Sequence, residues 1–162
     1  KNLKKCFKIF SSRKENNYKF VKKINMYPEE LCTPMREDLT SVGFIEMKDS
    51  DKVSEILDKK EGSVLVMINS VCGCAAGNAR PAVKMSTTYS KTPNLFTTVF
   101  AGQDIGATAT AREYMLPYPP SSPSIALFKD GNLVHFIERH HIEGRPAEMI
   151  AENLKQAFDE YC

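Results

Sequence analysis

The feature that most constrains this chain is a pair of cysteines separated by one glycine, Cys72-Gly73-Cys74. The apolar run 64–70 directly before the pair predicts a buried strand, and the alanine-containing segment after it predicts a helix. A close cysteine pair at a strand-to-helix junction suits thiol–disulfide exchange, because the N-terminal end of a helix carries about half a positive charge that favours thiolate. The pattern therefore predicts a redox site, and the alternative is a pair of inert, small core residues.

The spacing of the pair constrains the local backbone. Each residue of a regular helix turns about 100°, so side chains two positions apart point roughly 200° away from each other. The two sulfurs can meet only if Cys72 lies outside the helix, and we expect Gly73 to make the turn with unusual backbone angles at low steric cost. We predict that Cys72, which is nearest the helix N-terminus, is the nucleophile and that Cys74 is the resolving thiol.

The rest of the sequence alternates between helix and strand patterns, and we expect Pro34 to kink or split the first helix. An Asp-Gly pair at 130–131, between two apolar runs, is a strong hairpin signal. This order predicts an α/β protein with a thioredoxin-like fold, in which helices flank a central mixed β-sheet and one additional helix lies at the N-terminal side. The predicted strands are 44–47, 63–69, 95–100, 124–129 and 133–137, and the predicted helices are 28–42, 50–60, 74–89, 105–115 and 146–161.

A proline precedes the predicted hairpin. The stretch 121–131 resembles the segment of thioredoxins that carries a cis-proline, a strand and a turn. We therefore predict a cis peptide bond between Ser122 and Pro123, with Pro123 beside the active-site sulfur. The backbone of Ser122 is then placed to pair with an extended substrate as a short added strand.

Several motifs in order resemble the bacilliredoxin family. They are Asn69–Gly77 around the cysteine pair, Ala79-Arg80-Pro81, Val99–Asp104, Pro120–Ser124 and Ile142-Glu143-Gly144. The resemblance covers residues 27–162. It implies a cytoplasmic thiol–disulfide oxidoreductase that removes bacillithiol from S-bacillithiolated proteins. It further implies no tightly bound cofactor, bacillithiol as thiol co-substrate, and recycling by a bacillithiol disulfide reductase. Family members have also been regarded as weak disulfide isomerases.

Recognition of the substrate calls for a cationic contact, because bacillithiol carries a malate group. Arg80 and Arg112 are candidates, and the alternatives are ordinary structural arginines or anion binding by the helix amides at 73–76. A metal site is a weaker hypothesis, because zinc favours Cys-x₂₋₄-Cys spacing. It would combine the cysteine pair with scattered histidines, His135, His140 and His141. A non-catalytic, metal-binding or redox-sensing thiol module stays open as an alternative function.

The N-terminal segment 1–25 differs from the remainder, 26–162. It holds nine Lys/Arg and one Glu, whereas the remainder holds thirteen Lys/Arg and nineteen Asp/Glu. We expect residues 1–25 to be a basic extension that is disordered or non-native, and 26–162 to form the bacilliredoxin-like domain. The acidic balance of that domain argues against a nucleic-acid partner, and no apolar run has the roughly 18 residues of a membrane span.

Overall fold

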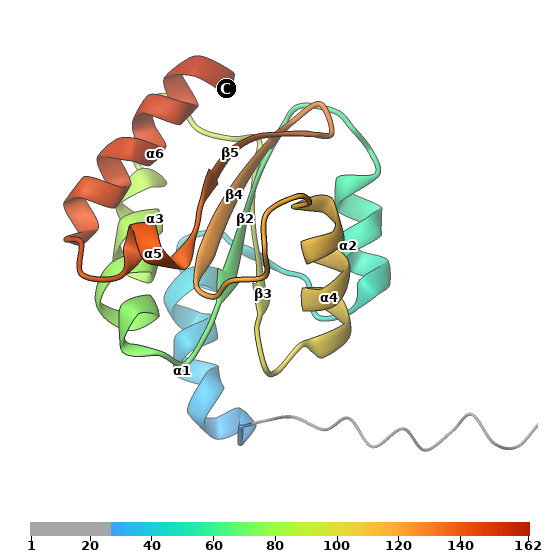
Figure 1. The fold of residues 1–162 in the computed structure, drawn as a ribbon, viewed down its shortest axis with the longest axis vertical. Helices are drawn as coiled ribbons and strands as arrows, with labels where there is room; N and C mark the ends of the chain where they lie inside the picture. Colours follow the sequence, from blue (N-terminus) through green and yellow to red (C-terminus); the bar gives the residue numbers. More distant parts are fainter. Residues whose placement is uncertain (1–26) are drawn as a thin grey trace, which may run out of the picture.

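The computed structural model describes residues 27–162, which form one five-stranded mixed sheet with helices on both faces (Figure 1). This confirms the predicted thioredoxin-like class with an additional N-terminal helix. The predicted extension 1–25, and Cys6 within it, lie outside the described residues. The strands are β1 (Ile45–Glu46), β2 (Ser63–Asn69), β3 (Leu95–Phe100), β4 (Ser124–Lys129) and β5 (Asn132–Ile137). The helices are α1 (Glu29–Thr40), α2 (Ser50–Leu57), the π-helix η1 (Ala75–Ala79), α3 (Arg80–Ser86), α4 (Ile105–Tyr114), α5 (Arg139–Ile142) and α6 (Ala147–Tyr161).

The strand order is β1-β3-β2-β4-β5, and the first three of these strands are parallel while β4 and β5 run antiparallel. Parallel strands end at the same edge of a sheet, so the segments that follow β2 and β3 meet there. The pairing of Ser124 with Ile68 places the start of β4 at that same edge. The cysteine pair, the segment after β3 and the start of β4 therefore gather at one end of the sheet, the lower end in Figure 1.

The central strand β2 is buried along its whole length and separates two apolar cores. Its alternate side chains divide between them: Leu65 and Met67 pack toward α3 and α6, whereas Val66 and Ile68 pack toward α2 and α4. The helices are arranged accordingly on the two sides of the sheet in Figure 1. Burial of β2 on both faces gives the cysteine pair a rigid support.

Three helical features differ from the sequence predictions. Helix α1 continues through Pro34 and is not split there, because this proline lies on the exposed side, where the carbonyl left without an N–H can bond to water. A kink at Pro34 stays a prediction. The predicted helix 74–89 is instead the five-residue π-helix η1 followed by α3, which has Pro81 in its first turn and ends at Ser86. Helix α5 was not predicted, since four residues are too few to show a periodic pattern. No helix within 27–162 has the length and apolar composition needed to span a membrane.

Candidate active site

Cys72 and Cys74 lie at the start of the helix that follows β2. They form a disulfide, and their Cα atoms are 5.5 Å apart. Cys72 precedes the first helical turn, and its carbonyl accepts hydrogen bonds from the amides of Ala75 and Ala76 at 3.1 and 3.2 Å. The prediction that Cys72 lies outside the helix is therefore confirmed. The prediction of unusual angles at Gly73 is wrong: this residue is helical without a positive φ, because the chain bends at Cys72 instead.

Two hydrogen-bond donors point at the sulfur of Cys72. The Ser70 hydroxyl and the Ala75 amide each lie 3.3 Å from Cys72 Sγ. Donors to sulfur stabilise a thiolate more than a thiol, and the helix N-terminus adds its partial positive charge. Sequence reasoning missed Ser70, since a serine two residues before a cysteine forms no recognisable motif by itself.

Arg80 fixes the segment from which Ser70 reaches the sulfur. It is 4% exposed, and its Nη1 donates to Asn69 Oδ1 and to the Ser70 carbonyl, both at 3.2 Å. Its Nε donates to Asp38 Oδ2 at 3.1 Å, and Asn69 Oδ1 also accepts the Ser70 amide at 2.8 Å. All of these contacts are with groups of the protein itself, so Arg80 has a structural role: it holds the end of β2 and Ser70 in place. Its predicted contact with substrate stays a prediction.

A second buried arginine, Arg36 of α1, connects α1 with the end of β1 and with the segment after β3 at the same end of the sheet. Its guanidinium donates to both carboxylate oxygens of Asp104 at 2.8 and 2.9 Å, to Glu46 at 2.9 Å and to Glu29 at 2.8 Å. Burial alone lowers the pKa of Arg36, but hydrogen bonds to Asp104 and Glu46 raise it above its usual value. The Arg36 guanidinium also lies 5.0 Å from the centroid of the ring of Phe100, the last residue of β3.

The Ser122–Pro123 peptide bond is cis, as predicted. Since β4 begins at Ser124, Pro123 lies at the end of the sheet that carries the cysteines. The Ser122 carbonyl accepts a hydrogen bond from Arg139 Nη1 at 3.3 Å. The roles of Pro123 beside the sulfur and of Ser122 in pairing with substrate stay predictions.

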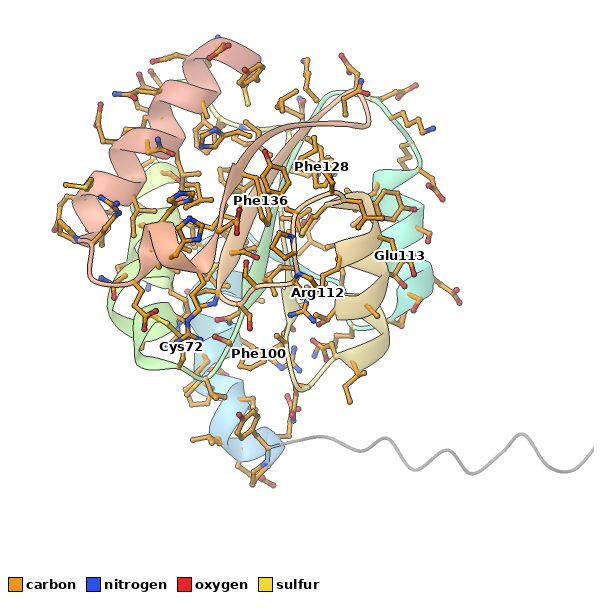
Figure 2. All side chains as sticks on the ribbon, in the orientation of Figure 1. Cys72, Phe100, Arg112, Glu113, Phe128 and Phe136 are labelled. Atoms are coloured by element: carbon orange, nitrogen blue, oxygen red, sulfur yellow. A yellow bond between two sulfur atoms is a disulfide. The ribbon has the colours of Figure 1, made fainter. Side chains whose placement is uncertain are left out.

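Arg112 has surroundings unlike those of Arg80. Its Nε is buried without a hydrogen-bond partner among residues 27–162, and so are Thr108 Oγ1 and Ser121 Oγ. Burial lowers the pKa of Arg112. In Figure 2 the side chain extends from α4 toward the middle of the molecule, whereas Glu113 points outward. Its predicted contact with substrate also stays a prediction.

The remaining thiols lie apart from this site. Cys32 is fully buried, and burial raises the pKa of its thiol. Cys162 is partly buried against the core. In the part of the chain that the structure describes, no group of three or more His, Cys, Asp or Glu side chains is arranged to hold a metal ion.

Solved structures share this fold. A thioredoxin from Schistosoma mansoni is 22% identical with a TM-score of 0.51, over 75% of this chain and 97% of that one. A mutant thioredoxin from Halobacterium salinarum is 15% identical with a TM-score of 0.52, over 74% and 91%. These likenesses show the thioredoxin fold. That fold, the cysteine pair at the start of its helix and the curated relatives below define a thiol–disulfide oxidoreductase.

Curated relatives narrow the class to a family. A bacilliredoxin from Cytophaga hutchinsonii is 58% identical, over 83% of this chain and 99% of that protein. A bacilliredoxin from Salinibacter ruber is 51% identical, over 84% of this chain and 81% of that protein. A family model described as disulphide isomerase matches residues 27–162. This chain belongs to the bacilliredoxin family.

Proposed function

We propose that this protein removes bacillithiol from S-bacillithiolated proteins, with Cys72 as nucleophile. The observation that carries the proposal is the position of Cys72, outside the helix, with two donors on its sulfur and Cys74 within disulfide reach. A sulfur held in this way stays available as a thiolate, and the thiolate is the form that attacks a disulfide.

The first step is transfer of bacillithiol to the enzyme. The Cys72 thiolate attacks the bacillithiol sulfur of the mixed disulfide, and a bond forms between these two sulfurs. The bond between bacillithiol and the client protein breaks, and the client cysteine leaves as a thiolate that takes a proton from water. The Ser70 hydroxyl and the Ala75 amide hold the attacking charge before the transfer.

The second step frees the enzyme from bacillithiol. The Cys74 thiolate attacks Cys72 Sγ, expels bacillithiol as a thiolate and forms the internal disulfide that the structure contains. Alternatively, a second bacillithiol attacks the bound one and leaves as bacillithiol disulfide. On the route through the internal disulfide, two bacillithiol molecules reduce it to two thiols and leave joined as bacillithiol disulfide. On both routes a flavin- and NADPH-dependent bacillithiol disulfide reductase then supplies the electrons that return bacillithiol disulfide to two bacillithiol molecules.

The surroundings of the cysteines would hold the substrate in this scheme. Ser122 and Pro123 would meet the extended client segment at the end of the sheet, and no tightly bound cofactor takes part. The setting is the cytoplasm, where a thiol enzyme works against capped protein thiols. Arg80 and Arg112 stay predictions as contacts to the cap.

The test uses a purified client protein capped with bacillithiol, and mass spectrometry follows the cap. We expect Cys72→Ala to abolish release, and Cys74→Ala to accumulate an adduct of one bacillithiol on Cys72. The control is Cys162→Ser, which removes a thiol far along the chain and keeps release at the wild-type rate. Release at a normal rate by Cys72→Ala would end the proposal.

Disulfide isomerisation is the second candidate, because the matching family is described as disulphide isomerase. The same cysteines would attack a non-native disulfide of a client and let it rearrange. Refolding of a scrambled ribonuclease separates the two functions. Rapid recovery of ribonuclease activity, together with slow removal of bacillithiol from the capped client, would favour the isomerase.

A further inference from the structure

A cavity of about 290 Å³ that is open to solvent lies between β5, α5 and α6, and several of its lining residues, such as His141 and Arg145, are exposed. Four of its lining side chains are polar, His135, His141, Arg145 and Asn153, and the others are apolar residues of β5 and α6. Sites for small molecules begin at roughly 300 Å³ and combine apolar walls with a few polar groups, which is the composition found here. The cavity therefore has the size and lining for a small ligand or for one end of a larger one.

The charge of the lining indicates an anion. Arg145 carries a permanent positive charge, two further lining residues are histidines, and within residues 27–162 no acidic side chain lines the cavity. No carboxylate of the described residues pairs with Arg145, whose Nη1 instead lies 3.8 Å from Met149 Sδ. His135 Nε2 lies 2.8 Å from Asn153 Oδ1, which fixes the orientation of that ring.

Two basic residues between β5 and Arg145 that do not line the cavity have acidic neighbours. Arg139 lies 3.4 Å from Glu143, and His140 lies 3.6 Å from Glu138. The rings of His140 and His141 are tilted by 50° relative to each other, with 3.8 Å between their centroids. Within 138–145, Arg145 is therefore the arginine without a carboxylate partner, and it lines the cavity, as expected of a site that takes a negatively charged group from outside.

Two contacts connect the cavity with the cysteine site. The Arg145 carbonyl accepts a hydrogen bond from Asn78 Nδ2, and Asn78 lies in η1, four residues after Cys74. At the other end of α5, Arg139 donates to the carbonyl of Ser122, next to the cis-proline. The segment 139–145, which forms one wall of the cavity, thus contacts both η1 after the cysteine pair and the loop that carries the cis-proline.

We infer that this cavity binds a carboxylate on a short hydroxy-acid group, and that its source is the malate end of bacillithiol. The inference rests on the proposed function. The Arg145 guanidinium offers the fork of donors that matches a carboxylate, the His141 ring can add a donor, and the apolar walls receive the carbon chain. A free dicarboxylate such as malate shares this chemistry and is the other source to be tested.

The three histidines of the chain provide a direct readout, because two line the cavity and His140 does not. The oxidised wild-type protein is titrated with three ligands while NMR follows the histidine ring signals. The ligands are S-methyl bacillithiol, which cannot exchange disulfides, free malate, and S-methyl cysteinyl-glucosamine, which lacks the malate. We expect the first two to shift His135 and His141 more than His140, and the third to leave all three in place.

Three outcomes overturn the inference. Absence of a shift with S-methyl bacillithiol excludes the cavity as its site. Equal shifts with the ligand that lacks malate show that the carboxylate is not recognised. Shifts with malate but not with S-methyl bacillithiol assign the cavity to a free dicarboxylate and refute the link to the thiol.

A charge-matched pair of variants tests the guanidinium. We expect Arg145→Gln to weaken binding of S-methyl bacillithiol at least about tenfold, because hydrogen bonds between charged groups contribute that much or more. Lys155→Gln removes the same charge from α6, outside the cavity lining, and should leave the affinity unchanged. Equal weakening by both variants would mean that only general charge attraction is involved.

Kinetics separate this inference from the proposed function. With one client carrying either a bacillithiol or a cysteine cap, Arg145→Gln should raise KM about tenfold for the first cap only. An equal rise for both caps would place the client protein in the cavity and overturn the inference. If the wild type releases bacillithiol normally while the histidines do not respond, only the cavity assignment fails. If the wild type releases none, the proposed function fails, and the histidine titration still decides the cavity.

Discussion

The two sides of the sheet at its active-site end treat buried polar groups in opposite ways. On the side of α1 and α3, Arg36 and Arg80 use their guanidinium groups in ion pairs and hydrogen bonds with α1, the ends of β1 and β2 and the segment after β3. On the side of α4, Arg112 and Thr108 have buried polar atoms without partners among the described residues. A buried polar group without a partner costs free energy, so the buried polar groups of the first side contribute stability and those of the second side do not.

The comparison shows why residue type alone does not assign a role. In the sequence, Arg80 and Arg112 are equivalent candidates for contact with an anionic substrate. In the fold, Arg80 fixes Asn69 and Ser70, and through Ser70 the sulfur of Cys72. Substitutions on the two sides should therefore differ in what they damage and by how much.

The largest effect is expected for Arg36→Met. This change leaves the Asp104 carboxylate, 3% exposed, without its cation, and breaking a buried ion pair on one side costs about 3–5 kcal/mol. The measurement is the free energy of unfolding in urea. Lys52→Met removes one partner of an exposed pair with Glu55 and should cost far less. If the two variants lost similar stability, the buried network would not be a major source of stability.

Arg80→Met should come next, with a loss of about 2–3 kcal/mol, because it leaves the buried Ser70 carbonyl without its donor and leaves Asn69 Oδ1 with the Ser70 amide alone. The loss is smaller than for Arg36, since the Asp38 side chain is 46% exposed and water can solvate its charge. Urea unfolding measures it, and Arg80→Lys should recover only part of the loss, because an ammonium cannot reproduce the planar fork. Full recovery with lysine would show that charge alone matters here.

Local patterns in the sequence predicted much of the fold and the chemical part of the site. The buried run of β2, the Asp-Gly turn at 130–131 and the proline before β4 each act over a few neighbouring residues, so they can be recognised without a structure. The turn at Gly73 was mispredicted for a local reason. The geometric argument required a bend between the two sulfurs, and the chain makes that bend one residue earlier.

What the sequence could not provide depends on contacts between distant segments. Arg36 and Asp104 are separated by 68 residues, and Arg80 and Asp38 by 42. No spacing rule connects such pairs, because the fold alone brings them together. The sequence did not reveal the cavity between β5 and α6 for the same reason. Its histidines are scattered in the sequence, where they suggested only a weak metal site.

On the α1 and α3 side of the sheet, Ser70→Ala should change the reactivity of the Cys72 thiol more than the stability of the protein. It removes one of the two donors to Cys72 Sγ, and loss of a hydrogen bond to a charged group should slow thiolate chemistry about tenfold. The measurement is the alkylation rate of Cys72 by iodoacetamide in the reduced protein at neutral pH. Cys162 in the same sample is an internal reference whose rate should not change. An unchanged rate at Cys72 would leave the Ala75 amide and the helix N-terminus as the stabilising groups.

The smallest loss of stability is expected for Arg112→Met, at less than about 1 kcal/mol. Methionine keeps a long, flexible side chain and removes a guanidinium whose pKa is lowered by burial. No hydrogen bond of Nε within 27–162 is lost, because that atom has no partner there. Urea unfolding beside Arg80→Met tests the comparison directly, and an equal loss would mean that Arg112 makes interactions as strong as those of Arg80. The same variant, assayed with clients capped by bacillithiol or by cysteine, tests Arg112 as a substrate contact. If KM rises for the bacillithiol cap alone and stability is unchanged, Arg112 on the α4 side of the sheet takes part in substrate recognition. The α1 and α3 side then keeps its role of holding the sulfur of Cys72.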